Sequence, residues 1–347
     1  MKPGVSIIIP AYNREQRLIH TVRSAFNQKS PDFNLELVIV DDLSTDDTWG
    51  AIQRLGKDII SIRHSVNLGP NAARTTGFRH SSGDYVTFLD SDDLLAPGSI
   101  ERHLAVLEST GADVCYGNWD IVTEDAFGTH KQYSTIISGN VSDPIDALLS
   151  DWWCPPFVYT IRRSCLEEPF PWDMLVQSRG SEDFDLLFQI AFSGARFTYD
   201  NNSRGSYIKH TDGRVSNESS DRTNLCSLEI LQKLQAQLTE HGQLSAERRH
   251  IFARRYLSLA KSFYGSDRSM FRECINQMKR VYPYYRGDSR LYRLLVNLFD
   301  FHGAELICEC RRKIYNVLLQ AGVTTNFYDK NSSVRMKNMP AIESRNE

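Results

Sequence analysis

Three carboxylates fall within four positions of the chain, at Asp90, Asp92 and Asp93, where an apolar segment ends in the stretch FLDSDD. Like charges this close repel one another, and each raises the pKa of the others. A hard divalent cation shared with a diphosphate explains all three. Mg²⁺ and Mn²⁺ are commonly held by one or two carboxylates and keep open positions for phosphate oxygens.

Two other interpretations explain the cluster less well. In an EF-hand, Leu94 and Leu95 would fall where an oxygen ligand and a glycine are needed. A capped turn into a helix near Ser99 explains one aspartate but not three. A bound cation also keeps the carboxylates ionised, so the sequence favours a metal site.

A second acidic pair, Asp41-Asp42, follows another apolar segment. We favour a ligand role for Asp42, whose carboxylate can accept a hydrogen bond from the imide N–H of a uracil base or from ribose hydroxyls. Guanine and thymine also offer an N–H, so the base stays open. For Asp46, a ligand role and a cap on the next helix are both open.

The stretch NLGPNAARTTG spans residues 67–77 and combines a tight turn with the start of a helix. Arg74 on that helix carries a planar guanidinium suited to phosphate, although an arginine on a helix is more often solvated. The stretch is not a P-loop, because no Gly-Lys-Ser/Thr follows.

Three later groups carry weaker signals. Glu182-Asp183 starts a predicted helix, where the helix dipole favours acids whether or not they react. His210 follows a predicted strand, and a lone histidine is more often structural than a ligand. Trp152 and Trp153 could stack on an acceptor sugar or pack in the core.

Strands that alternate with helices must position these residues. Apolar, largely β-branched runs predict buried strands, and helical spacing of apolar residues predicts the segments between them. We predict strands at 5–9, 35–40, 59–64 and 85–89, and helices at 14–28, 45–55 and 70–80. This alternation indicates an α/β fold with a mostly parallel sheet, in which ligands gather beyond the carboxyl ends of the strands.

The rest of the chain becomes increasingly helical. We predict a helix at 100–109, a strand at 113–119, a helix at 182–193, two closing strands at 196–199 and 206–210, and helices from 221 onward. Amphipathic stretches between 291 and 319 separate around Gly303. The predicted parts are an α/β domain at 1–215, a helical domain at 216–325 and a disordered tail at 326–347.

Composition excludes several classes of protein. Seven scattered cysteines with no CxxC pair argue against a disulfide scaffold and for free thiols in a reducing cytosol. No segment approaches the about 18 apolar residues of a membrane span. Residues 1–215 carry 19 Lys and Arg against 29 Asp and Glu, whereas residues 216–347 carry 21 against 14. We expect a cytoplasmic protein with no nucleic-acid partner.

Five motifs in order resemble the nucleotide-sugar site of inverting family-2 glycosyltransferases with the GT-A fold. The motifs are VSIIIPAYN, VIVDDLSTDDT, NLGPNAARTTG, YVTFLDSDD and GSEDFDLLFQIAFSG, and the likeness covers about residues 3–215. It implies transfer of a sugar from a nucleotide diphosphate donor, with Mg²⁺ or Mn²⁺, to a saccharide or lipid-linked acceptor. Surface polysaccharide or glycolipid synthesis would be the setting.

The resemblance also implies roles for residues at matching positions. Donor contacts would come from Pro10, Ala11, Tyr12, Asp42, Gly69, Arg74, Asp90 and Ser91. Asp92 and His210 would be metal ligands, while the role of Asp93 is open. Asp183 would be the general base, and Glu182, Trp152 and Trp153 would lie toward the acceptor. Asp183→Asn should then abolish transfer while donor binding survives.

Alternatives to this function are testable. A phospho-acceptor receiver domain would need a lone aspartate on the third strand and a lysine on the last, and the chain offers neither convincingly. A non-catalytic nucleotide-sugar-binding or scaffold protein would tolerate loss of Asp183. The arginine pairs Arg248-Arg249, Arg254-Arg255 and Arg311-Arg312 have three interpretations: peripheral contact with an anionic membrane at its inner face, a solvated helix face, or an oligomer contact.

Overall fold

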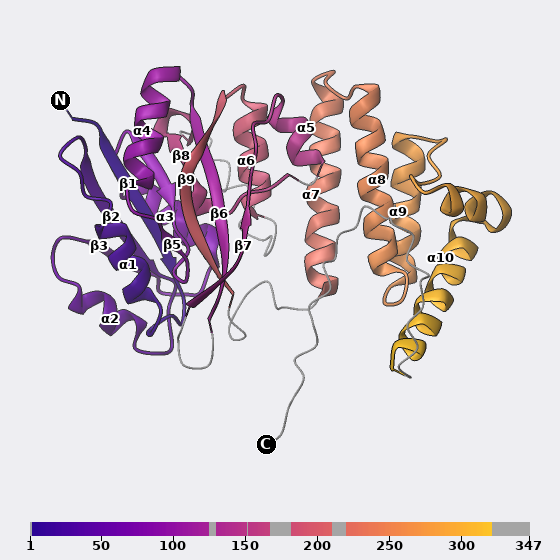
Figure 1. Ribbon diagram of the computed structural model, residues 1–347, viewed down its shortest axis with the longest axis horizontal. Helices are drawn as coiled ribbons and strands as arrows, with labels where there is room; N and C mark the ends of the chain where they lie inside the picture. Colours follow the sequence, from indigo (N-terminus) through magenta and orange to yellow (C-terminus); the bar gives the residue numbers. More distant parts are fainter. Residues whose placement is uncertain (1, 125–129, 151, 167–181, 210–219, 321–347) are drawn as a thin grey trace. The chain divides into compact units, whose positions relative to one another are not determined.

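A computed structural model describes residues 2–124, 130–150, 152–166, 182–209 and 220–320, and Figure 1 shows its elements in chain order. The chain divides into two compact units, Met1–Gln237 and Leu238–Glu347. This division falls inside helix α7 (Ser220–Glu240), so most of α7 belongs to the first unit, together with the α/β part.

A nine-stranded mixed sheet forms the centre of the first unit, with strands in the order β3-β2-β1-β4-β8-β6-β9-β5 and β7 paired to β6. Its first four strands are mutually parallel, as the alternation of strands and helices predicts. They are β1 (Gly4–Ala11), β2 (Asn34–Asp41), β3 (Ile60–Arg63) and β4 (Tyr85–Phe88). The remaining strands are β5 (Leu94–Leu95), β6 (Val114–Glu124), β7 (His130–Ile136), β8 (Tyr159–Arg162) and β9 (Phe197–Lys209).

Helices cover both faces of this sheet. Helix α3 (Pro70–Arg79) lies so close to β1 that a Cβ at Gly77 would overlap the side chain of Ile8. Helix α4 (Ser99–Thr110) lies on the other face, where His103 contacts Thr160. The further helices of this unit are α1 (Leu18–Phe26), α2 (Thr48–Arg54), α5 (Pro144–Leu149) and α6 (Glu182–Phe192). Two short 3₁₀ turns, Pro156–Val158 and Arg163–Leu166, flank β8.

The predicted α/β fold class is confirmed, with two local corrections. The two predicted closing strands are one continuous strand, β9, because the polar Asn201-Asn202 region is absorbed at a shift in register against β6 instead of forming a turn. The predicted strand at 113–119 is correct in place but short, because β6 extends to Glu124 through its pairing with β7.

A buried histidine ties α4 to the sheet. His103 Nδ1 lies 2.9 Å from Thr160 Oγ1, and His103 Nε2 lies 2.6 Å from Ser203 Oγ. Burial lowers the pKa of His103 to about 4, although the charge of Asp200 raises it in part. The imidazole is therefore neutral in the folded protein at neutral pH.

This pKa predicts acid destabilisation. The pKa of the imidazole is near 6.5 in the unfolded chain and about 4 in the folded protein. The unfolded chain therefore binds a proton first as the pH falls, so the free energy of unfolding is undiminished above pH 6.5 and decreases as the pH falls toward 4. The loss should reach about 3 kcal/mol. Denaturant unfolding at pH 7 and pH 4.5 should show a smaller pH dependence for His103→Gln than for the wild type. Equal pH dependence in the two proteins would exclude this role.

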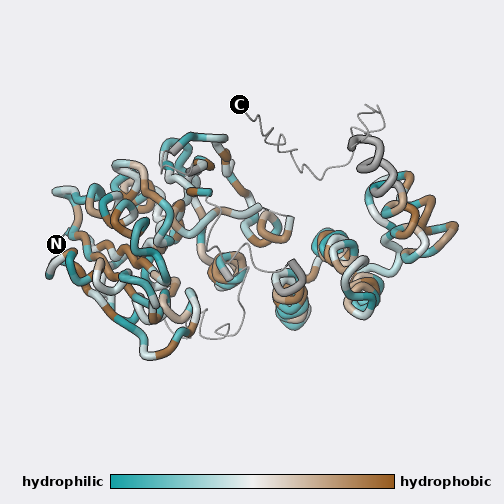
Figure 2. The backbone as a smooth tube through the Cα atoms, turned by 90° about the horizontal axis from the view of Figure 1, so that it is seen from below, coloured by the Kyte–Doolittle hydropathy of each residue, from teal (hydrophilic) through white to brown (hydrophobic). Residues whose placement is uncertain are grey.

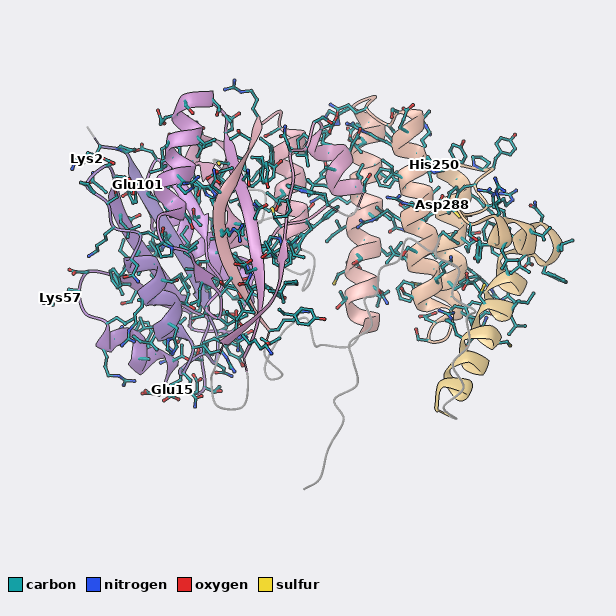
Figure 3. The ribbon with its side chains drawn as sticks, viewed as in Figure 1. Lys2, Glu15, Lys57, Glu101, His250 and Asp288 are labelled. Atoms are coloured by element: carbon teal, nitrogen blue, oxygen red, sulfur yellow. The ribbon has the colours of Figure 1, made fainter. Side chains whose placement is uncertain are left out.

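The second unit is helical, as predicted. It contains the end of α7 with α8 (Ala246–Phe263), α9 (Arg268–Val281) and α10 (Arg290–Gln320). Hydrophobic and hydrophilic residues alternate along these helices in Figure 2. His250 and Asp288, labelled in Figure 3, lie 3.8 Å apart at Nε2 and Oδ1. The predicted separation around Gly303 is confirmed, and the break lies three residues earlier: the chain leaves helical geometry at Asp300, whose carboxylate accepts the Gly303 N–H at 2.9 Å and caps the next turn. In the residues described, no helix is long and apolar enough to span a membrane.

Candidate active site

The loops after β1 and β2 are bonded to each other at the carboxyl end of the sheet. Asn13 donates its backbone N–H to Ser44 Oγ at 2.9 Å, and its side-chain oxygen accepts the Thr45 N–H at 2.8 Å. Asn13 and Leu43 both have positive φ, a backbone conformation that costs free energy in residues other than glycine. Pro10 and Ala11 are buried at the end of β1, and Tyr12 beyond them is 44% exposed, so of these three predicted donor contacts Tyr12 presents the open surface.

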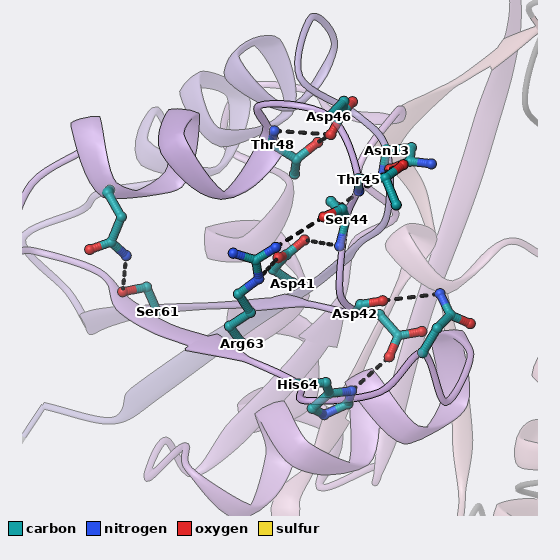
Figure 4. A network of polar contacts seen from close by, with 12 residues as sticks. Asn13, Asp41, Asp42, Ser44, Thr45, Asp46, Thr48, Ser61, Arg63 and His64 are labelled. Atoms are coloured by element: carbon teal, nitrogen blue, oxygen red, sulfur yellow. Dashed lines mark hydrogen bonds and ion pairs between the residues drawn. The ribbon is translucent and has the colours of Figure 1, made fainter.

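Asp42 is surrounded by donors from its own fold (Figure 4). Its carboxylate accepts the Leu68 and Gly69 N–H groups at 2.9 and 2.7 Å and lies 2.7 Å from His64 Nδ1. A carboxylate has about four lone-pair sites, so three of them are used. Asp42 thus fixes the turn before α3, and contact with a base stays a prediction.

His64 was missed by sequence reasoning. It lies on the strand-to-loop junction after β3, between Asp42 and Thr76 Oγ1, which is 2.9 Å from its Nε2. A histidine next to a polar turn carries no distinctive spacing, and only the alignment of β2 and β3 brings it to Asp42.

Two other acids of this region are also structural. Asp41 lies 3.0 Å from Arg63 Nε and accepts the Ser44 N–H at 3.2 Å (Figure 4). Asp46 accepts the Thr48 N–H at 3.0 Å at the start of α2. This contact agrees with the helix-capping role, one of the two roles left open for Asp46. Burial acts to raise the pKa of Asp46, but the hydrogen bonds from Thr48 outweigh it and lower the pKa.

Arg74 joins two of the predicted site acids. Its Nη2 lies 2.5 Å from Asp90 Oδ1, and its Nη1 lies 3.2 Å from Asp183 Oδ1. Arg74 itself is only 3% exposed. Gly69, with φ of +91°, starts α3 in a conformation that a side chain would strain, and this start sets the helix direction that brings Arg74 to the end of β4. The structure therefore brings Arg74, Asp90 and Asp183 together from three separate elements.

Each of the three clustered aspartates has a contact of its own. Asp92 lies 3.3 Å from Arg14 Nε, while Asp93 accepts the Ile208 N–H at 2.9 Å and is buried. Asp90 faces Arg74, as described above. The guanidinium groups of Arg74 and Arg14 and the Ile208 N–H thus reduce the repulsion between the three carboxylates. Asp93 anchors β9 to the end of β4, and Ser91 between the acids is buried.

Among the described residues, the groups suited to a divalent cation at this site are carboxylate oxygens. No group of three His, Cys, Asp or Glu that could hold a metal occurs among the described ranges. Asp90 and Asp92 nevertheless offer hard carboxylate oxygens at a strand end, and Mg²⁺ needs only one or two such ligands when a diphosphate supplies others. His210, the second predicted metal ligand, lies outside the described residues, as does the side chain of Glu182.

Tyr159 on β8 is a further residue beside this cluster that the sequence did not reveal. The phenol is buried, and within the described part of the chain its hydroxyl has no hydrogen-bond partner. Burial raises the pKa of Tyr159, and the nearby charge of Asp183 raises it further, so the phenol is neutral. Cys154 is likewise buried, and burial and Asp183 both raise the pKa of its thiol.

The two tryptophans of WWCPPF pack against aromatic side chains. Trp152 donates its indole N–H to the Ser138 carbonyl at 3.0 Å and meets Tyr116 edge-on. Trp153 meets Trp119 edge-on, with ring centroids 5.7 Å apart. Both side chains are partly exposed, so stacking on an acceptor sugar stays a prediction.

The sequence profile described as Glycosyl transferase family 2 matches residues 6–169. That range contains most of β1, all of β2 to β8, and the acids at the ends of β2 and β4. Residues 6–169 are therefore similar to the family-2 glycosyltransferases, and we call them the family-2 domain.

Curated relatives match part of this chain. A GalNAc(5)-diNAcBac-PP-undecaprenol beta-1,3-glucosyltransferase of Campylobacter jejuni is 39% identical over 102 residues, which is 28% of this chain and 32% of the relative. The Escherichia coli enzyme WfaP, a UDP-Glc:alpha-D-GlcNAc-diphosphoundecaprenol beta-1,3-glucosyltransferase, is 39% identical over 119 residues, 34% of this chain and 46% of the relative. The chain therefore spans less than half the length of either relative.

The fold as a whole is similar to a solved structure. S. aureus TarS 1–349 in complex with UDP-GlcNAc matches with a TM-score of 0.62 and 17% identity, over 90% of this chain and 92% of that one. At this identity the likeness concerns the fold, and it confirms the predicted GT-A architecture of the family-2 domain followed by a helical part.

Proposed function

We propose that this protein is an inverting glycosyltransferase that moves a sugar from a nucleotide diphosphate donor to a hydroxyl group of a saccharide or lipid-linked acceptor. The observation that carries the proposal is the contact of Arg74 with both Asp90 and Asp183. It places a cation suited to a diphosphate between the acid that ends β4 and the acid predicted to be the base.

The proposed chemistry begins with a proton transfer. An acceptor hydroxyl has a pKa far above neutrality, so its attack on the anomeric carbon needs a general base within hydrogen-bond reach. Asp183, on the first turn of α6 and partly exposed, takes that proton. In-line attack forms the new glycosidic bond as the bond to the nucleoside diphosphate breaks, so an α-linked donor gives a β-glycoside.

A UDP-sugar is the donor that we favour. TarS was solved with UDP-GlcNAc and with UDP, and the name of WfaP specifies UDP-Glc. The fourth lone-pair site of Asp42 is compatible with the imide N–H of uracil. The exposed ring of Tyr12 offers a stacking surface directly after Ala11, whose carbonyl accepts the Asp42 N–H at 2.8 Å.

A divalent cation, Mg²⁺ or Mn²⁺, completes the proposal. Asp92 would hold it, with Asp90 toward the sugar or ribose and His210 as a further ligand. When bound, such a cation neutralises the negative charge that grows on a departing diphosphate. Because Arg14 faces Asp92 in the structure, cation binding requires this arginine to give up the carboxylate or to share it.

Donor and metal binding can be tested together. We expect UDP-sugars, but not GDP- or dTDP-sugars, to raise the melting temperature in Mn²⁺, and EDTA to remove the shift. Asp92→Asn should weaken the Mn²⁺-dependent part, whereas Asp47→Asn, an exposed acid paired with Arg54, should leave it unchanged. A UDP-sugar shift that persists in EDTA would contradict the metal site. No shift with any nucleotide would contradict the donor site.

Turnover separates catalysis from mere binding. A scaffold protein would bind the donor but neither transfer nor slowly hydrolyse it, and loss of Asp183 would change nothing. Release of UDP from UDP-sugars, measured with and without polyprenyl-diphosphate-linked acceptors, distinguishes the two functions. Both relatives named above act on undecaprenol-linked saccharides according to their names, so these acceptors are the first to try.

We also propose that the second unit contacts an anionic lipid surface, where lipid-linked acceptors reside. Residues 238–320 carry 15 Lys and Arg against 8 Asp and Glu. On α10 the exposed Leu291, Leu294 and Leu298 follow helical spacing, and Arg290 and Arg293 beside them are exposed. Among the predicted arginine pairs, Arg254 and Arg255 are only half exposed, so this leucine face is the better candidate.

Vesicle binding tests this contact. The protein should sediment with vesicles rich in phosphatidylglycerol and not with phosphatidylcholine vesicles, and Leu294→Glu with Leu298→Glu should reduce binding about tenfold or more. Leu225→Glu, at an exposed leucine of α7, is the matched control. A concentration-dependent dimer in light scattering that the paired substitutions abolish, without vesicle binding, would assign the face to a second copy instead.

A further inference from the structure

Two polar contacts join α6 to α7 in the first unit. Asp185 is 0% exposed, and its two carboxylate oxygens accept from Lys233 Nζ at 3.2 and 2.9 Å. Gln189 adds a bond to the same carboxylate at 3.1 Å. Gln189 and Gln237 then exchange amide hydrogen bonds of 3.2 and 3.0 Å.

The spacing of these residues is matched on the two helices. Asp185 and Gln189 are four residues apart on α6, and Lys233 and Gln237 are four apart on α7, so each pair lies on one helix face a turn apart. The other buried residues of the two helices include Leu186 and Leu234, whose apolar contacts are non-directional. Sliding one helix by a turn, about 5.4 Å, would break both polar contacts and leave the buried charge of Asp185 unpaired.

Asp183 lies two residues before Asp185 on the same helix. Residues two apart on an α-helix point about 200° apart, that is, to nearly opposite sides. Accordingly Asp183 meets Arg74 on one side of α6, while Asp185 meets Lys233 on the other. The axial position of α6 therefore determines where the carboxylate of Asp183 lies relative to Arg74.

We propose that the Asp185–Lys233 and Gln189–Gln237 contacts form a clamp that fixes the register of α6 and so positions Asp183 for proton abstraction. The inference rests on the proposed function, in which Asp183 is the base. Lys233 and Gln237 are positioning residues. They lie on α7, beyond residues 6–169 that match the family profile, so the catalytic unit extends further along the chain than the profile does.

Stability alone is a poor reason for this ion pair. Breaking a buried pair by removing one partner is destabilising, but replacing both partners by apolar residues of similar volume is often neutral or stabilising. Apolar residues would join α6 to α7 without selecting one register. If the contacts act as a clamp, replacing both partners of the ion pair should affect the stability and the catalytic rate differently.

Four variants separate the two effects. Lys233→Arg keeps a cation opposite Asp185 and should retain near-wild-type kcat. Lys233→Met should lower both the melting temperature and kcat, the latter by about 10- to 100-fold, because small displacements of a reacting group cost this much. Asp185→Leu combined with Lys233→Met should regain the melting temperature while kcat stays low and the donor KM stays within about twofold. Lys57→Met, at an exposed lysine of the same unit labelled in Figure 3, is the control.

Amide hydrogen exchange supplies a readout that does not depend on turnover. Exchange along α6 should be faster than in the wild type for Lys233→Met and for the double variant, and unchanged for Lys233→Arg. A double variant that regains both kcat and wild-type exchange would overturn the clamp. If the wild type neither transfers nor hydrolyses any UDP-sugar, the proposed function fails, while the exchange experiment still decides whether the contacts fix α6.

Discussion

Replacing Asp183 by Asn is expected to lower kcat by about 10²- to 10⁴-fold, the range that a general base contributes. Asn cannot take a proton from the acceptor, yet its polar side-chain oxygen can still face Arg74, whose Nη1 lies 3.2 Å from Asp183 Oδ1 in the wild type. The melting temperature and the shift caused by the donor should therefore change little. Initial rates of UDP release and thermal shift with the UDP-sugar measure both quantities.

The control for this substitution is Asp47→Asn, which also removes one negative charge from the first unit but at an exposed ion pair with Arg54. It should leave kcat unchanged. Near-normal turnover in Asp183→Asn would mean that another group is the base. Loss of the donor shift would instead assign Asp183 to donor binding.

Replacing Arg74 by Met is expected to lower kcat/KM by about 10²- to 10³-fold, since the variant loses a preorganised positive charge in a buried site. It should also destabilise the fold by about 3 kcal/mol, because Asp90 and Asp183 lose their shared cation. Lys at this position keeps the charge but not the planar fork that reaches both carboxylates, so it should restore only part of the rate. Denaturant unfolding and steady-state kinetics measure the two effects.

A double variant separates stability from catalysis at this position. Arg74→Met combined with Asp90→Asn removes a charge of each sign and should regain part of the lost stability, but not the rate. Arg79→Met removes an exposed arginine of the same helix and should change neither. Wild-type kinetics in Arg74→Met would exclude a role for the guanidinium at the diphosphate.

The strands and helices of the first unit were predictable because their signals are local. Val5–Ile9 and Leu35–Val40 are apolar runs without alternation, and both are central parallel strands. Gly69-Pro70 predicts the start of α3, where the glycine takes a positive φ. The missed features depend instead on partners distant in sequence: β9 passes through a polar segment because β6 pairs with it on both sides of the register shift.

The site shows the same division between local and distant information. Sequence alone assigned one cation to Asp90, Asp92 and Asp93 because they are neighbours in the chain. In the structure Arg74 contacts Asp90, Arg14 contacts Asp92, and the Ile208 amide contacts Asp93. Spacing along the chain could not reveal these three protein partners, because they lie 16 to 115 residues away. The shared cation stays a prediction.

Residue types and their local order by themselves determined that acids and an arginine follow the strands of an α/β sheet, and which family the chain resembles. Hydrophobic periodicity is sufficient for the strands and helices, since it specifies which segments are buried and where each ends. The resemblance to the family comes from the five motifs instead. Only the tertiary structure decided that Arg74 lies between Asp90 and Asp183, that His64 contacts Asp42, and that Lys233 reaches Asp185 from α7. Hydrogen bonds and ion pairs act over about 3 Å, so they depend on how the chain returns to the same place and not on how far apart the residues are in sequence.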